Sequence, residues 1–223
     1  MRISVFGDSI LKGVILENGK YVMDSDTKRR LTDDCGLDLD THCKFGATVN
    51  VGSRLLDREL LRGEPGKYTV LEFGGNDSDY NWAKIAAEPD KVHLSNTPPK
   101  AFEKTYADMI RTVRESGSIP VVATLPPISA ARYFRWICRD GLDPKAILHW
   151  LGDIDIIFRK QELYSRMAEA LAKKFKCAVL DLRAAFPTEK NALEAVLCDD
   201  GIHPNRLGQE LIYRRCLSQL AHA

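Results

Sequence analysis

At 223 residues the chain is long enough for one α/β domain with a buried core, and its 44% hydrophobic and 28% charged residues are ordinary for a globular protein. Its 32 basic residues almost balance its 31 acidic ones, so the formal net charge is only +1. This balance argues against nucleic acid and anionic membranes as partners. We therefore expect a single domain over residues 1–223.

The six cysteines are scattered along the chain without a C-x-x-C pair, which argues against a zinc site and a disulfide framework. Cys177 and Cys216 lie in apolar patterns and are expected in the core. Cys35 and Cys43 bracket a loop and could pair in an oxidising compartment. No signal segment precedes the first strand, and no run approaches the ~18 apolar residues of a membrane span. We expect a cytoplasmic protein without stable membrane association.

Short apolar runs, rich in β-branched residues, alternate with helical patterns along the chain. They cover residues 3–6, 42–45, 69–73, 119–125 and 177–180, and the second run is the weakest. Such alternation is typical of parallel strands that are covered on both faces. The pattern therefore predicts an α/β fold with a parallel sheet.

Three helices are predicted from apolar residues at helical spacing. The first covers residues 100–116 and is expected to stop at Gly117. The second carries an apolar stripe that steps by four from Leu163 to Phe175. The third is expected to begin near Pro204, since proline suits the first turn of a helix. All three apolar stripes are expected to pack in the core.

Three stretches, at residues 15–40, 76–99 and 128–152, are predicted to be irregular. Long loops in a compact domain often form walls or lids of functional sites. The third stretch contains four aromatic residues, Tyr133, Phe134, Trp136 and Trp150, with Arg132, Arg135 and Arg139 nearby. Two interpretations of it stay open: a wall that stacks a sugar ring or covers an acyl chain, and an inserted helix that packs on the body.

Small and polar residues follow several predicted strands, at the edge where an open parallel sheet binds its ligands. Asp8 and Ser9 follow the first strand, Gly46 follows the second, and Gly-Gly-Asn-Asp at residues 74–77 follows the third. A histidine comes from Asp-Asp-Gly-Ile-His at residues 199–203, before the last helix. These segments predict a pocket at one end of the sheet.

The residue types in this pocket suit nucleophilic catalysis. Ser9, on a turn between strand and helix, would lie at the positive end of a helix dipole, although it could also merely cap that helix. A serine hydroxyl needs a base, and His203 is the best candidate among the five histidines. Asp200 precedes His203 by three residues and could hold the other imidazole nitrogen. Asn76 and the backbone N–H of Gly46 could stabilise an oxyanion.

Along its whole length the chain resembles the SGNH hydrolases, the GDSL-type esterase and lipase superfamily. Gly7-Asp8-Ser9 resembles the first block of that family, Gly46 its second-block glycine, Gly74-Gly75-Asn76-Asp77 its G-x-N-D block, and Asp200-Gly201-Ile202-His203 its D-x-x-H block. The resemblance implies a flavodoxin-like three-layer αβα sandwich with a five-stranded parallel sheet. It also implies ester hydrolysis without a metal or other cofactor.

The resemblance also implies a role for each site residue. Ser9 would be the nucleophile, His203 the base and then the acid, and Asp200 the residue that orients the imidazole. The N–H groups of Ser9 and Gly46, together with Asn76, would form the oxyanion hole. The remaining carboxylates, Asp8, Asp77 and Asp199, are expected to be structural and to bond nearby N–H groups in their turns.

The substrates of that family include short-chain esters, lysophospholipids, acyl thioesters and acetylated sugars. We expect a serine esterase that removes short acyl groups, such as acetyl groups on carbohydrates. The alternative is a lysophospholipase or acyl-thioesterase for longer chains. A metal-dependent phosphoesterase and a non-catalytic binding module are less favoured, and no Rossmann or P-loop glycine pattern follows any strand.

Overall fold

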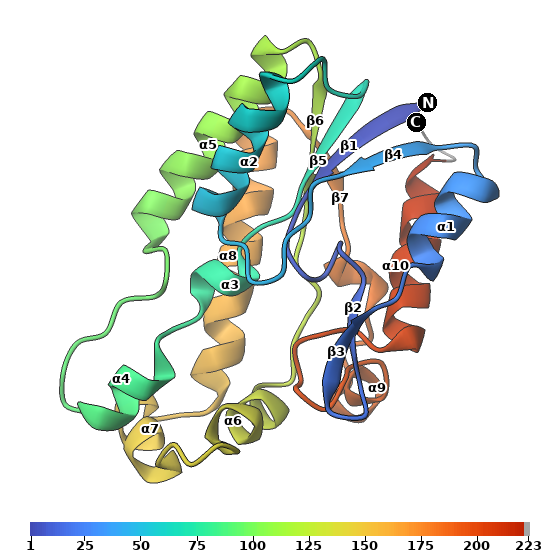
Figure 1. The fold of residues 1–223 in the computed structure, drawn as a ribbon. Helices are drawn as coiled ribbons and strands as arrows, with labels where there is room; N and C mark the ends of the chain where they lie inside the picture. Colours follow the sequence, from blue (N-terminus) through green and yellow to red (C-terminus); the bar gives the residue numbers. More distant parts are fainter. Residues whose placement is uncertain (221–223) are drawn as a thin grey trace.

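Five parallel strands form the central sheet of the computed structural model, which describes residues 1–220 (Figure 1). They are β1 (Arg2–Phe6), β4 (Asp38–Thr41), β5 (Tyr68–Leu71), β6 (Ile119–Ala123) and β7 (Ala178–Leu180), in the order β4-β1-β5-β6-β7. When only these strands are counted, this is the flavodoxin-like order 2-1-3-4-5. The predicted α/β fold with a five-stranded parallel sheet is confirmed.

Helices cover both faces of the sheet (Figure 1). One face carries α2 (Val49–Leu60), α5 (Pro99–Glu115) and α8 (Asp155–Lys174), and the other carries α1 (Asp26–Asp33) and α10 (Arg206–Leu220). The remaining short helices are α3 (Gly75–Ser78), α4 (Trp82–Ala87), α6 (Ala130–Cys138), α7 (Pro144–Leu151), η1 (Arg183–Ala185) and α9 (Lys190–Ala195). Helices α4, α6 and α7 lie beyond the carboxyl ends of the strands (Figure 1).

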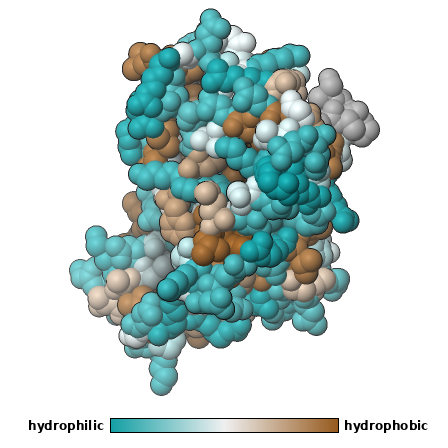
Figure 2. Space-filling view, turned by 45° about the vertical axis from the view of Figure 1, so that its right-hand side comes forward, coloured by the Kyte–Doolittle hydropathy of each residue, from teal (hydrophilic) through white to brown (hydrophobic). Residues whose placement is uncertain are grey.

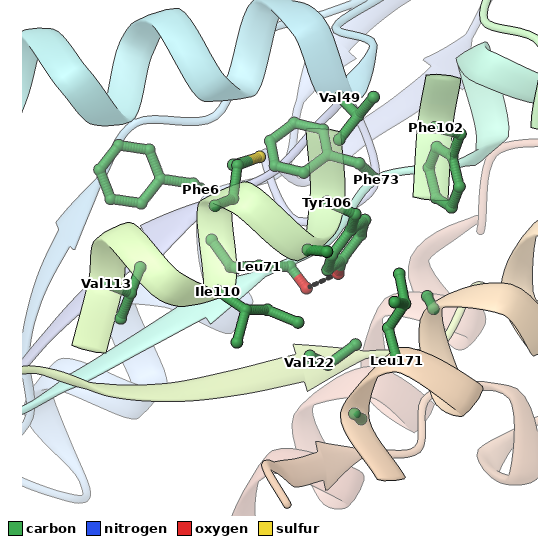
Figure 3. Close-up of a cluster of buried hydrophobic side chains, with 14 of the residues drawn as sticks. Phe6, Val49, Leu71, Phe73, Phe102, Tyr106, Ile110, Val113, Val122 and Leu171 are labelled. Carbon is green, nitrogen blue, oxygen red and sulfur yellow. Dashed lines mark hydrogen bonds between the residues drawn. The ribbon is translucent and has the colours of Figure 1, made fainter. Parts of the chain in front are cut away.

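The larger core lies between the sheet and α2, α5 and α8 (Figure 3). Phe6 and Leu71 reach it from the sheet, and Phe102 and Tyr106 reach it from α5; all four are almost fully buried. The hydroxyl of Tyr106 donates to the backbone oxygen of Leu71 at 2.8 Å. The phenol therefore fills the core without leaving its polar atom unsatisfied.

The weakest strand prediction was wrong in position. Residues 42–45 follow the strand rather than form it, because β4 ends at Thr41 and pairs with β1 from Arg2–Asp38 to Val5–Thr41. β4 is an edge strand with two aspartates, so it lacks the apolar run of a strand buried on both faces. The other four strands lie where they were predicted, within two residues at each end.

The three stretches predicted to be irregular contain regular structure; the prediction was wrong for 15–40, holds for most of 76–99, and gives way in 128–152 to the alternative of an inserted helix. Residues 15–40 hold α1 and an antiparallel hairpin of β2 (Val14–Glu17) and β3 (Lys20–Met23). The turn of this hairpin is Asn18-Gly19, with φ values of 51° and 73°. Asn-Gly between two apolar runs is the strongest short-range signal for a hairpin. α4 covers only six residues of 76–99, whereas α6 and α7 occupy most of 128–152.

The predicted helices exist, but the apolar stripe of one was misplaced and the start of another lies slightly later than predicted. Leu163 of α8 is 41% exposed, and the buried face runs through Tyr164, Ala168 and Leu171. α10 begins at Arg206 rather than at Pro204, because the side chain of Asn205 accepts the first free backbone N–H groups of the helix.

The surface in Figure 2 is mostly hydrophilic, with apolar residues in separate patches. All six cysteines are free, so Cys35 and Cys43 are not paired. Within residues 1–220, no helix has both the length and the apolar character to span a bilayer.

Candidate active site

Ser9, His203 and Asp200 form a continuous hydrogen-bonded chain at the carboxyl end of the sheet. Nε2 of His203 is 2.8 Å from the Oγ of Ser9, and Nδ1 is 2.6 Å from Oδ2 of Asp200. A carboxylate can only accept, so Nδ1 donates to Asp200 and leaves Nε2 of the neutral ring to accept from the hydroxyl. The exposed fractions are 6% for Ser9, 3% for His203 and 0% for Asp200. Solvent therefore competes little for these bonds.

The loop before α10 fixes the positions of Asp200 and His203 relative to each other. The second carboxylate oxygen of Asp200 accepts the backbone N–H groups of Ile202 at 3.0 Å and His203 at 3.1 Å. Gly201 has a φ of 76°, and a Cβ there would lie 2.6 Å from the Cβ of Arg132. A glycine is therefore needed for this tight turn.

The environment of Asp200 keeps its carboxylate ionised. Burial alone would raise the pKa, but the hydrogen bond and charge of His203, with the two backbone N–H groups, outweigh it and hold the pKa below its usual value. Asp200 can therefore orient the imidazole and stabilise a positive charge that forms on it.

No helix follows Ser9, so the expected helix dipole and helix cap were wrong. The backbone N–H of Lys12 donates to the oxygen of Asp8 at 3.2 Å, and the chain then turns at Gly13 into β2. Gly13 has a φ of 77°, and a Cβ there would lie 2.3 Å from the backbone oxygen of Asp24. The left-handed conformation of Gly13 and its close approach to Asp24 thus turn the chain away from a helical path.

Asn76 lies beside the Ser9 turn, at the start of α3. Its Nδ2 donates to Oδ2 of Asp8 at 2.8 Å and to the backbone oxygen of Ala47 at 3.1 Å. Gly46 precedes Ala47 in an exposed loop and has a φ of 70°. Within residues 1–220 the backbone N–H of Ser9 has no acceptor. Asn76 and the N–H of Ser9 thus lie at one turn, whereas Gly46 is connected to it only through the bond of Asn76 to Ala47 and does not line the cavity described below.

A buried acid that sequence reasoning missed, Glu72, lies beneath this turn. Its Oε2 accepts the backbone N–H of Asp8 at 3.2 Å, and its side chain is fully buried. Burial, followed by the charge of Asp8, raises the pKa of Glu72 well above its usual value and so favours the protonated form. The alternation Val70-Leu71-Glu72-Phe73 at the end of β5 is an unusual place for a carboxyl group, and this was the available signal.

The aspartates expected to be structural make different contacts. Oδ1 of Asp8 accepts the backbone N–H of Ile10 at 2.8 Å, within its own turn as predicted. Asp77 instead accepts the N–H of Val49 through both oxygens at 3.0 Å, and so binds the start of α2. Burial raises the pKa of Asp77 to about 6.

A small cavity of about 80 Å³ opens beside Ser9. Its apolar lining comes from Ile10, Leu125, Pro126, Ile128, Ile157 and Ile202, and its polar lining includes Asn76, Gln161 and His203. Typical small-ligand pockets measure roughly 300–1,000 Å³. The cavity beside Ser9 is therefore suited to a small group.

Three aromatic side chains, Tyr21, Phe45 and Trp136, form what we call the aromatic rim beside His203. The ring centroids of Tyr21 and Phe45 lie 5.1 Å and 5.8 Å from that of His203, and Trp136 lies 6.3 Å from Tyr21. Tyr21 is 39% and Phe45 47% exposed. Only Trp136 was singled out from the sequence, because the hairpin that carries Tyr21 went unrecognised.

The other aromatic residues of 128–152 pack within the protein. The hydroxyl of Tyr133 donates to Asp79 at 2.6 Å, and Nε1 of Trp150 donates to the backbone oxygen of Lys91 at 3.1 Å. Arg132 donates to the backbone oxygen of Glu194 at 2.7 Å. The interpretation of inserted helices that pack on the body is thus confirmed for most of this stretch.

The remaining histidines lie apart from Ser9. His42 contacts Asp40 at 3.1 Å, and His149 contacts Asp90 at 2.9 Å. His93 bonds a backbone oxygen, and His222 lies outside the described residues. Among residues 1–220, no three His, Cys, Asp or Glu side chains are grouped so that they could hold a metal ion.

A parallel α/β sheet with an Asp–His–Ser chain of hydrogen bonds at its carboxyl edge is the arrangement of a serine hydrolase. The GDSL-like Lipase/Acylhydrolase family matches residues 5–211, and the chain belongs to this family of GDSL-type carboxylic ester hydrolases. No curated protein matches the chain.

Solved structures of similar fold include a lipase/acylhydrolase from Enterococcus faecalis, at 19% identity and a TM-score of 0.67 over 98% of this chain and 94% of that chain. An acetyl xylan esterase, AlAXEase, is 20% identical with a TM-score of 0.65 over 99% of this chain and 100% of that one. A lipolytic protein of the G-D-S-L family from Veillonella parvula is 14% identical, with a TM-score of 0.68 over 100% and 99% of the two chains.

Proposed function

We propose that this esterase removes short acyl groups, such as acetyl groups on carbohydrates, through an acyl-enzyme on Ser9. The observation that carries the mechanism is the chain of hydrogen bonds from Asp200 through His203 to the Ser9 hydroxyl. This arrangement supplies a nucleophile, a base in contact with it, and a carboxylate that orients the base.

In the first half-reaction, Oγ of Ser9 attacks the carbonyl carbon while its proton passes to Nε2 of His203. The carbonyl oxygen becomes an oxyanion in a tetrahedral intermediate. When this intermediate collapses, the bond to the alcohol breaks, and the leaving alkoxide takes the proton from Nε2. Asp200 stabilises the imidazolium between these steps.

In the second half-reaction, a water molecule gives a proton to Nε2 and attacks the acyl-Ser9 carbon. The tetrahedral intermediate then expels Oγ, which recovers the proton from His203, and the carboxylic acid is released. We assign the oxyanion hole to the N–H groups of Ser9 and Gly46 and to Asn76. The free N–H of Ser9 and the position of Asn76 beside the turn support this assignment.

The preference for a short acyl group rests on the size of the cavity. A volume of about 80 Å³ leaves room for an acetyl group but not for a long acyl chain. The exposed rings of Tyr21 and Phe45 beside His203 offer flat apolar surfaces for the leaving group, as a sugar ring requires. The likeness in fold to an acetyl xylan esterase supports the same choice.

Esters of p-nitrophenol from acetate to palmitate, assayed beside acetylated sugars, test the proposal. We expect acetate to be the best ester and acetylated sugars to be hydrolysed. Tyr21→Leu should raise KM for acetylated sugars by about threefold to tenfold, because aromatic contacts contribute roughly 0.5–1.5 kcal/mol. It should leave KM for methyl acetate unchanged.

The longer-chain alternative, a lysophospholipase or acyl-thioesterase, predicts the opposite order of esters. Palmitate as the best ester, with acetylated sugars untouched, would contradict the short-chain proposal. Activity that is lost in EDTA would indicate a metal-dependent phosphoesterase. Failure of a fluorophosphonate probe to label Ser9 would favour a binding module. The single domain over 1–223 and the cytoplasmic location stay predictions.

A further inference from the structure

A second and larger cavity lies on the other side of the sheet, beneath α1 and α10. Its volume is about 470 Å³, within the roughly 300–1,000 Å³ that is typical of small-ligand pockets. β1, β5, β6 and β7 form its floor through Ile3, Val5, Val70, Val121 and Leu180. Leu31 of α1 and Ile212 of α10 face it from above. Nothing in the ester hydrolysis described above uses this space.

The lining is predominantly apolar, and the cavity is elongated. Gln209, Ile212, Cys216 and Gln219 line it along one side of α10. These four residues span about 15 Å of helix, at roughly 1.5 Å per residue. Protein interiors rarely leave apolar space of this size unfilled, because lost packing destabilises the fold. The shape and lining therefore suit one extended hydrocarbon chain.

Two cationic side chains lie at the edge of this cavity. Lys12 and Lys28 both line it and are both exposed. Leu11, the neighbour of Lys12, lies close to Cys43, and both residues line the cavity: a Cβ at Gly7 would be 3.3 Å from Cβ of Leu11 and 3.5 Å from Sγ of Cys43. Lys28 bonds Thr41, the last residue of β4 and two residues before Cys43, so both lysines lie at the end of the cavity where β1 and β4 end.

The acidic group that lines the cavity is already compensated. Oδ1 of Asp24 accepts the backbone N–H of Asp26 at 3.0 Å, and Oδ2 lies 3.4 Å from Arg206. Lys28 donates to the hydroxyl of Thr41 at 2.9 Å, which leaves its charge without a carboxylate partner. Among the described residues neither lysine forms an ion pair, and the other carboxyl groups whose charges reach Cys43, those of Glu72 and Asp8, are buried beneath the Ser9 turn, so the exposed rim itself is cationic.

We propose that this cavity binds a single-chain anionic amphiphile, of which a medium-chain fatty acid is the simplest example. The hydrocarbon chain lies along α10 between the helix and the sheet, and the carboxylate lies beside Lys12 and Lys28. The site is separate from the cavity at Ser9, although Ile10 lines both. The ligand binds as the free carboxylate, which has no ester bond to hydrolyse, so it is not a substrate.

Calorimetry with laurate and with dodecyltrimethylammonium, below their micelle concentrations, tests the proposal on the full chain. We expect saturable binding of laurate, with the cationic amphiphile of equal chain length bound roughly tenfold more weakly or worse. The double substitution Lys12→Glu and Lys28→Glu should weaken laurate binding by roughly tenfold. The matched control, Lys100→Glu with Lys173→Glu, reverses two exposed lysines on the opposite layer and should bind laurate as the wild type does.

Cys216→Trp fills the cavity from α10 and should abolish laurate binding while p-nitrophenyl acetate is still hydrolysed. That hydrolysis reports separately on the Ser9 site. The proposal is overturned if the wild type does not bind laurate, or if both lysine variants bind it equally well. It is also overturned if folded Cys216→Trp retains full affinity. If Cys216→Trp does not fold, the proposal is judged from laurate binding by the two lysine variants and from the weaker binding of dodecyltrimethylammonium.

Discussion

The side chain of Asn76 donates a hydrogen bond to the carboxylate of Asp8 at 2.8 Å, directly beside the candidate nucleophile. The second proton of the same amide is directed to the backbone oxygen of Ala47 at 3.1 Å. Both amide protons are therefore engaged before any substrate binds. An oxyanion at Ser9 must share or replace one of these acceptors, while Asp8 keeps the amide in place.

Asn76→Ala removes this donor and should lower kcat by about 10²–10³, with little change in KM, as expected for a donor that acts in the transition state. Steady-state kinetics with p-nitrophenyl acetate measure both constants. Asn191→Ala, at an exposed asparagine in α9, is the matched control and should be unchanged. An Asn76→Ala enzyme with normal kcat would remove Asn76 from the proposed oxyanion hole.

Ser9→Ala and His203→Ala should each abolish turnover and leave the fold intact, since the one lacks the nucleophile and the other the base. Asp200→Asn keeps the size of the side chain but not its charge, and should lower kcat by about 10⁴. Rates and circular dichroism spectra of the three variants provide the measurement. Substantial turnover by either alanine variant would refute the triad.

Glu72 should tolerate an amide but not an apolar side chain. Glu72→Gln keeps an acceptor for the N–H of Asp8 and stays neutral, so stability and kcat should be close to those of the wild type. Glu72→Leu leaves that buried N–H without its acceptor, which should lower the free energy of unfolding by about 1–3 kcal/mol. Urea denaturation of the two variants compares them. Equal loss in both would mean that the ionisable acid itself is required.

Asp77 should make the protein less stable as the pH rises. Its pKa of about 6 in the folded state exceeds the ordinary 3.8 of an unfolded chain, so the folded state binds the proton more tightly. The penalty is absent below pH 3.8 and complete above pH 6. A shift of this size corresponds to about 3 kcal/mol.

Asp77→Asn cannot ionise, so its free energy of unfolding should fall less steeply than that of the wild type between these pH values. Urea denaturation at a series of pH values measures the two slopes. The loss of a carboxylate oxygen at Val49 lowers the stability of the variant at every pH, so the slope is the informative quantity. Parallel curves would show that Asp77 does not titrate in this range.

Much of the fold and the principal residues of the candidate site could be predicted, because local patterns encode them. Apolar runs marked four of the five sheet strands, and the turns after them marked Ser9 and Asn76. The edge strand β4 was misplaced because three of its four residues, Asp38, Asp40 and Thr41, are polar. The β2–β3 hairpin was missed although its Asn-Gly turn is a clear signal, and Tyr21 was missed with it.

The sequence by itself determined which chemical groups are present and which pairs are local. Asp200 and His203 are three residues apart in one turn, so their contact follows from the chain alone. Ser9 and His203 are 194 residues apart, and they meet only because β1 and the loop before α10 end at the same edge of the sheet. The tertiary structure also decided that the pKa of Glu72 is raised, since it depends on burial and on a neighbouring charge that no local pattern specifies.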